Sequence, residues 1–237
     1  MVGSRQHAFF ANQHEASHGH LSKIKWLNNG VATIFCSFPM GHNFQYFKEY
    51  HLMHHRFLNT DLDPSYVPVK NDPNWVFPMN KREFLLISLK DFLGLNYKVI
   101  TIYESLYSRQ SNSAMVFLTR FGFYFVLPLL CFVLTKDFYY SILILLYWVV
   151  TKYTLLVWLI RLRTIAEHSG PFLHGEESRD IEGNWLEKFF IIPHHVGYHF
   201  QHHDRPDIPA YLVKAENCQF LYPRIFGKDG IIKNLIN

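Results

Sequence analysis

Cysteine pairs, secretory signals and dense positive charge are scarce in this sequence, and each absence removes a class of protein. The 237 residues include three cysteines, Cys36, Cys131 and Cys218, which lie far apart and form no CxxC pair. This spacing argues against a disulfide framework or a thiolate metal site and is typical of a reducing compartment. The first residues lack the long apolar run of a secretory signal. The net charge of +4 comes without a Lys/Arg block, so the sequence predicts no nucleic-acid partner.

Histidine, in contrast, is abundant and clustered, with 15 in the chain. Two segments, 51–55 and 199–203, follow the pattern His-x-x-His-His, and a shorter His-x-x-x-His box stands at 14–18. On a helix, positions i, i+3 and i+4 share one face, so we expect each longer box to aim three imidazoles one way and the short box two. The box histidines are His14, His18, His51, His54, His55, His199, His202 and His203. Neutral imidazole suits iron, zinc, copper and nickel, so the repeated boxes predict a metal centre.

Two apolar runs, 114–134 and 138–160, are each long enough to cross a bilayer as a helix, which takes about 20 residues. The short segment 135–137 separates them, so they predict a tight antiparallel hairpin. Lys152 interrupts the second run and is expected to face protein or water. A pair of buried helices in a soluble bundle is the alternative.

Positive charges orient this hairpin. Lys98, Arg109 and Arg120 precede it, and Arg161 and Arg163 follow at once. The positive-inside rule therefore places both ends in the cytosol and the turn outside. Because two crossings return the chain to its starting side, the third box can meet the first two at the cytosolic face.

The order HEASH, HLMHH, membrane hairpin and HFQHH resembles the membrane fatty acid desaturase superfamily over roughly residues 5–213. Around the third box, Val196-Gly197-Tyr198-His199 and His202-His203-Asp204 look like the sphingolipid (dihydroceramide) Δ4-desaturase branch. The resemblance implies one all-α domain over residues 1–237, an integral membrane helical bundle with a cytosolic histidine-rich di-iron cap.

The resemblance also implies a reaction in which two irons per chain, O2 and two electrons introduce a double bond into a fatty acyl or sphingoid chain. It makes the eight box histidines iron ligands and adds His168, at the end of the last membrane helix, as a ninth. Thr164 stands where some members have an asparagine that assists through water, so that role is not carried over. Because the chain has no His-Pro-Gly-Gly signature of a fused cytochrome b5 domain, a separate electron donor of the cytochrome b5 or ferredoxin type is implied.

Ligating histidines need a partner for their second ring nitrogen, usually a carboxylate or a carbonyl. Among the neighbouring acidic residues we favour Glu167 and Asp204 for this role. His195, one to two turns before the third box, is a further candidate. The other acidic candidates are Glu15, Asp61, Asp63 and Asp207. We interpret His7, which lies outside the boxes, as an ordinary surface or structural histidine.

Three other readings stay open. His14-Glu15-x-x-His18 also matches the zinc metalloprotease motif with Glu15 as general base, although the two longer boxes have no role in such an enzyme. The same scaffold supports alkane, sphingolipid and carotenoid hydroxylases, because the outcome depends on how the substrate carbons sit relative to the oxidant. A non-enzymatic membrane protein that retains the fold is the third, and the intact boxes argue against it.

The start of the chain carries its own expectation. Superfamily members usually have a membrane hairpin before the first box, whereas 13 residues precede His14 here. Residues 5–11 look like the end of such a helix. We therefore expect a fragment or a shortened gene product, with two more apolar runs of about 20 residues encoded upstream.

Overall fold

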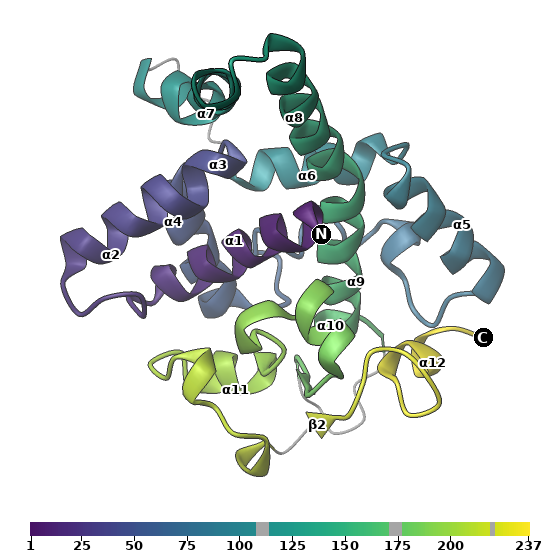
Figure 1. Ribbon diagram of the computed structural model, residues 1–237. Helices are drawn as coiled ribbons and strands as arrows, with labels where there is room; N and C mark the ends of the chain where they lie inside the picture. Colours follow the sequence, from purple (N-terminus) through teal and green to yellow (C-terminus); the bar gives the residue numbers. More distant parts are fainter. Residues whose placement is uncertain (108–113, 171–176, 219–220) are drawn as a thin grey trace.

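The computed structural model describes residues 1–107, 114–170, 177–218 and 221–237, and it is built almost entirely from helices (Figure 1). The α-helices are α1 (Val2–Ser17), α2 (Lys25–Val31), α3 (Phe38–Met40), α4 (Phe44–Phe57), α5 (Lys81–Phe92), α6 (Tyr97–Tyr107), α7 (Ala114–Thr135), α8 (Phe138–Thr151), α9 (Val157–His168), α10 (Trp185–Phe190), α11 (His199–Asp204) and α12 (Ile231–Leu235). Two π-helical segments join neighbouring α-helices, η1 (Ala32–Ser37) and η3 (Lys152–Leu156). Short 3-10 turns occur at η2 (Pro73–Trp75), η4 (Pro193–His195), η5 (Ala210–Leu212) and η6 (Ala215–Asn217). The predicted all-helical class is confirmed.

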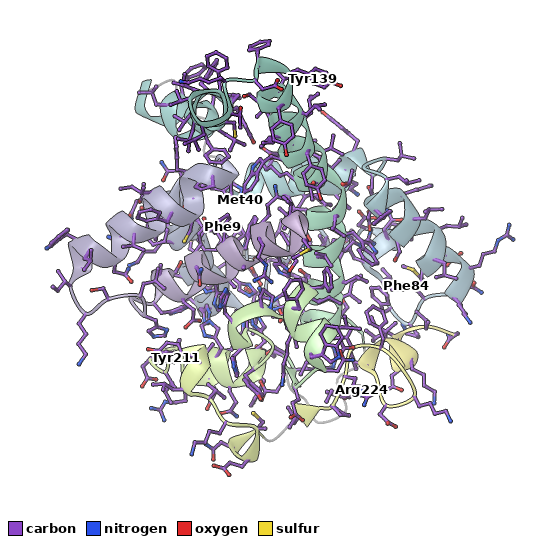
Figure 2. All side chains as sticks on the ribbon, in the orientation of Figure 1. Phe9, Met40, Phe84, Tyr139, Tyr211 and Arg224 are labelled. Carbon is purple, nitrogen blue, oxygen red and sulfur yellow. The ribbon has the colours of Figure 1, made fainter. Side chains whose placement is uncertain are left out.

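A continuous helix made of α8, η3 and α9 runs through the middle of the molecule (Figure 1). Over its 31 residues, Phe138–His168, it is long and apolar enough to cross a membrane, and it is the one such helix among the described residues. The other predicted span is also a helix, α7, but its described apolar part, Phe121–Thr135, is shorter. Figure 2 shows Tyr139 at the outer tip of α8, where its side chain is 72% exposed.

Lys152 faces protein, as the sequence predicts. Its Nζ atom donates a hydrogen bond to Glu104 Oε1 at 2.8 Å and lies 3.4 Å from the hydroxyl of Tyr124. Lys152 opens the π-helical segment η3, and such widened turns often occur at functional sites. The cation is therefore paired inside the protein.

The helix continues past the apolar run to His168, the residue expected at its end. Arg161, the first residue after the run, is buried in an ion pair. Arg161 donates a hydrogen bond to Asp91 Oδ2 at 2.8 Å and another to the carbonyl of Asn74. Because its charge is paired inside the protein, Arg161 does not support the positive-inside argument for the orientation of the hairpin. Of the other charges in that argument, Arg109 and the side chain of Arg120 lie outside the described residues. The cytosolic orientation of the boxes stays a prediction.

Two packing arrangements hold the histidine-bearing helices. In one core cluster, Met40 is fully buried and packs with Phe10 and Phe47, between α1, α3 and α4 (Figure 2). In the other arrangement, strands β1 (Asp180–Ile181) and β2 (Leu221–Tyr222) pair in parallel. Asp180 Oδ1 accepts a hydrogen bond from the backbone N–H of Gln201 at 3.1 Å, which fixes the first turn of α11.

Candidate metal centre

Helices α1, α4, α9 and α11 bring all nine predicted ligands together in two neighbouring clusters. We call His14, His51, His55 and His202 the first cluster and His54, His168, His199 and His203 the second cluster; within each, the candidate ligand atoms all lie within 4.8 Å of one another. His18 joins the first cluster, because its Nε2 lies 2.9 Å from His51 Nε2. The prediction that distant boxes converge is therefore right as a matter of geometry.

All three rings of each longer box point toward the clusters, but they divide between the two. His51 and His55 enter the first cluster while His54, between them, enters the second. The third box does the reverse, with His202 in the first cluster and the other two in the second. The physical reason is helical geometry: at about 100° per residue, positions i+3 and i+4 diverge by about 100° around the axis. Each longer box therefore contributes to both clusters, whereas the short box contributes to the first cluster.

The spacing of the ring nitrogens fits ligands of a shared ion. His51 Nε2 lies 2.9 Å from His18 Nε2 and 3.1 Å from His55 Nε2, and His199 Nε2 lies 2.8 Å from His168 Nε2 and 3.1 Å from His203 Nε2. A neutral imidazole has one N–H, so hydrogen bonds cannot account for several such contacts at one nitrogen. These nitrogens are therefore placed as donors that share an ion.

Burial keeps these rings neutral. It lowers the pKa of His55 to about 3 and that of His18 to about 4, and it holds the pKa of His14 well below the usual value. A neutral ring offers a lone pair, which is the form that binds metals. The Nε2 atom of His14 is also buried and has no hydrogen-bond partner among the described residues. The residues present therefore fit a metal site.

Asp63 orients a ligand of the second cluster. Its carboxylate is fully buried, and both oxygens lie 3.0 Å from His54 Nδ1. Because a carboxylate only accepts, His54 donates from Nδ1, which leaves Nε2 free to bind metal. The backbone N–H groups of Asn59 and Ser65 donate to the same carboxylate at 3.0 and 2.8 Å. Sequence reasoning ranked Asp63 below other acidic residues; the tight Asn59–Pro64 turn after the box was the available signal.

Two of the candidate carboxylate partners, Glu15 and the favoured Glu167, lie next to cluster histidines. Glu15 Oε1 lies 3.4 Å from His14 Nδ1, and Oε2 accepts hydrogen bonds from the ring of His20 at 3.1 Å and from the backbone of Ala210 at 3.0 Å. Glu167 Oε2 lies 3.8 Å from His199 Nδ1, while Oε1 accepts from Arg163 Nε at 2.8 Å. Both carboxylates are buried. Their roles at a metal stay predictions.

The favoured Asp204 and the further candidate His195 do not reach the clusters. Asp204 and His195 are exposed, and in the described part of the chain neither makes a hydrogen bond to a cluster histidine. Asp204 ends the short helix α11 one position beyond His203 and turns outward, because rings at i and i+4 already occupy the inward face. Thr164 donates its hydroxyl to the carbonyl of Ile160 at 3.0 Å, within its own helix.

A cavity of about 140 Å³ lies beside both clusters. One wall holds five of the cluster histidines, His14, His51, His54, His168 and His199. Most of the remaining lining is apolar or aromatic: Phe10, Phe47, Tyr50, Val69, Trp75, Ile102, Tyr103 and Ile160. These residues come from separate parts of the chain, so no sequence motif predicts that they line one cavity. The cavity can hold a hydrocarbon segment against the histidines.

The chain matches known proteins over most of its length. The fatty acid desaturase model matches residues 1–216. The chain is 25% identical over 94% of its length to the dihydrorhizobitoxine desaturase of Bradyrhizobium elkanii, of which it covers 67%. It is 29% identical over 89% of its length to the sphingolipid delta(4)-desaturase/C4-monooxygenase of Mus musculus, of which it covers 61%. It is 29% identical over 83% of its length to the sphingolipid delta(4)-desaturase of Bos taurus, of which it covers 56%. No solved structure matches.

Proposed function

Because the chain belongs to the fatty acid desaturase family, we propose that its two clusters hold two irons and that it introduces a double bond into a fatty acyl or sphingoid chain. One observation carries this proposal: nine imidazoles form two adjacent clusters, and five of them line a mostly apolar cavity. When bound, iron supplies the activation of O2 with two electrons, which side chains alone cannot perform. Imidazole is among the ligands that suit iron.

The side chains of the protein position the substrate and keep water away from it. His51, His54 and His199 lie on the cavity wall, so a hydrocarbon segment in the cavity lies against both clusters. The apolar side chains around them, among them Phe10 and Phe47, exclude water from the reacting carbon atoms. Holding the chain in one place converts reaction at an unactivated carbon into an effectively unimolecular step.

The first test is metal content together with product mass. Purified protein from an iron-replete host should contain close to two irons per chain, and the lipid product should weigh two mass units less than its substrate. Stoichiometric zinc without iron would refute the di-iron site. The electrons come, in this proposal, from a separate cytochrome b5- or ferredoxin-type donor, so reduced donor should be consumed in step with product.

Hydroxylation of the lipid is the second candidate reaction, and the name of one relative supports it. The printed name of the Mus musculus relative combines a desaturase with a C4-monooxygenase. Both reactions begin at the same substrate carbon, so the same cavity serves either. A product heavier by one oxygen, in place of one lighter by two hydrogens, would assign this chain to the hydroxylases.

We also propose that the histidine clusters lie on the cytosolic side of an integral membrane protein. The apolar helix Phe138–His168 supports a membrane location. With the boxes inside, the 135–137 turn lies outside. A cysteine placed at Lys136 should then react with an impermeant thiol probe on intact cells; reaction only after permeabilisation would contradict the orientation.

A further inference from the structure

Two consecutive residues outside the histidine boxes, Arg179 and Asp180, are fully buried and carry opposite charges. They lie in the chain between α9, which ends at His168, and α11, which begins at His199. Those two histidines belong to the second cluster, and their Nε2 atoms lie 2.8 Å apart. Because a buried charge needs hydrogen-bond partners, the contacts of Arg179 and Asp180 show what this segment holds together.

Arg179 binds the end of α9 on both sides of His168. Its Nη1 atom donates hydrogen bonds to the carbonyl oxygens of Ala166 at 3.2 Å and Ser169 at 2.8 Å. Its backbone N–H donates to the carbonyl oxygen of Glu167 at 3.1 Å. The last carbonyls of a helix have no partner inside the helix, so they need donors from elsewhere. Arg179 supplies those donors around the ring that α9 gives to the second cluster.

Asp180 binds the start of α11. Its Oδ1 atom accepts a hydrogen bond from the backbone N–H of Gln201 at 3.1 Å, and its backbone pairs with Tyr198 in an antiparallel bridge. The first N–H groups of a helix need an acceptor from outside, which is usually the side chain of the residue before the helix. Tyr198 holds that position and makes no such hydrogen bond with its side chain. Asp180 therefore takes over the capping role from another part of the chain.

The backbone after these two residues lies very close to the segment that leads into α11. The N–H of Ile181 donates a hydrogen bond to the carbonyl oxygen of Gly197 at 2.7 Å. A Cβ atom at Gly197 would lie 2.5 Å from the carbonyl oxygen of Ile181, so a side chain at this position would force the two strands of backbone apart. The Cα atoms of Arg179 and Asp180 are about 3.8 Å apart, as in any trans peptide. One short segment therefore fixes the end of α9 relative to the start of α11.

We propose that Arg179 and Asp180 are positioning residues that set the geometry of the second cluster. Through α9 they place His168, and through α11 they place His199 and His203. Loose ligands bind a metal ion weakly, because ordering them costs free energy on binding. The first cluster depends less on this segment, because α9 and α11 together give it a single ring. The inference rests on the proposed metal function and adds to it the residues that arrange one of the two sites.

The test measures the affinity of the whole chain for Fe²⁺, in detergent and without oxygen, by competition with a chelator. Two backgrounds separate the clusters. His54→Ala with His199→Ala leaves the first cluster, and His51→Ala with His202→Ala leaves the second cluster. Each further variant is made in both backgrounds and in the wild-type chain, so that its effect on each cluster is measured separately.

Three changes test the pair, and a fourth is the control. Asp180→Ala removes the acceptor, Arg179→Met removes the donors at similar side-chain length, and Asp180→Asn retains an oxygen acceptor. The matched control is Glu187→Ala. Glu187 is also a buried carboxylate that accepts backbone N–H groups, from Ile225 at 3.0 Å and Phe226 at 2.9 Å, but it stands on α10, which carries no box histidine.

We expect Asp180→Ala and Arg179→Met each to lower the Fe²⁺ affinity of the second cluster about 10- to 100-fold, the usual effect of removing a group that orients metal ligands. The first cluster should lose less affinity in both variants. Asp180→Asn should bind Fe²⁺ as its parent does. Glu187→Ala should lower the temperature of unfolding without a selective loss at the second cluster. If Asp180→Ala does not fold, Arg179→Met decides the question by itself.

Equal losses at the two clusters would show that the pair supports the fold in general, and they would overturn the inference. Unchanged affinity at the second cluster, or the same selective loss in Glu187→Ala, would also overturn it. Conversion of lipid is recorded separately from metal binding. A wild type that binds iron and shows the selective loss in the variants, but converts no lipid, would refute the proposed reaction while the positioning role stands. A wild type that binds no iron would refute both.

Discussion

The rings of His55 and His203 stack with their centroids 4.1 Å apart and their planes 22° from parallel, although the two residues belong to different clusters. His55 comes from the second box and His203 from the third, 148 positions later in the chain. This contact joins the two clusters directly. Substitutions at one cluster should therefore also be tested for their effect on metal binding at the other cluster.

The division of each longer box between the two clusters predicts the iron content of double variants. His54→Ala with His199→Ala removes two ligands from the second cluster, so about one iron per chain should remain in the first. His54→Ala with His55→Ala removes one ligand from each cluster, so iron at both should fall. Metal analysis of purified protein measures this, with exposed His194→Ala as control. The same iron content in both double variants would contradict the division.

Asp63 is predicted to hold His54 in its ligating orientation. Asp63→Asn replaces an acceptor oxygen with an amide and should lower metal affinity at the second cluster about 10- to 100-fold. The matched control is Asp61→Asn, since the Asp61 side chain is 80% exposed and pairs with Lys70 at 2.6 Å. Chelator competition followed by metal analysis reports the affinity. Equal affinities of the two variants would show that the buried hydrogen bond has no such role.

The metal-free protein should lose stability on acidification. Burial lowers the pKa of His18 to about 4 and of His55 to about 3 from the ordinary 6.5. Between pH 6.5 and 4 these histidines are protonated in the unfolded chain but remain neutral in the folded chain. The free energy of unfolding therefore falls as the pH drops. At pH 5 the loss is about 2 kcal/mol for each histidine.

Denaturant titrations of the metal-free protein at pH 7.5 and pH 5 measure this effect. His18→Gln removes one of the buried histidines whose pKa is lowered and should make the difference in unfolding free energy between the two pH values smaller. A wild-type protein that is as stable at pH 5 as at pH 7.5 would mean that the histidines are protonated in the folded state.

The ion pair between η3 of the long apolar helix and α6 gives a stability prediction. Lys152 Nζ and Glu104 Oε1 lie 2.8 Å apart, and both side chains line a small cavity next to the main one. Lys152→Met leaves the carboxylate without its cation and should destabilise the protein by about 3–5 kcal/mol. Lys152→Met combined with Glu104→Gln should recover much of that loss. Thermal unfolding in detergent compares the variants; a double variant as unstable as the single one would argue against the pairing.

Sequence periodicity was sufficient to identify the histidines that cluster, because each longer box lies on one helix. The i, i+3, i+4 spacing identified His51, His54 and His55 as a set, and the structure brings all three to the clusters. The order of boxes and apolar runs was also sufficient for family membership, which the match over residues 1–216 confirms. Local periodicity says nothing about which rings from different helices share a centre, so the division between clusters was missed.

The sequence by itself determined the ligand types, the helices that carry them and the apolar helix around residues 138–160, because these depend on neighbours within a few residues. Only the tertiary structure decided that Asp63, and not Asp204, supports a ligand, and that His7 shares a cavity with Arg163. Those outcomes depend on how α1, α4, α9 and α11 pack. Packing sets which face of each helix is inward, and many distant side chains contribute to it at once.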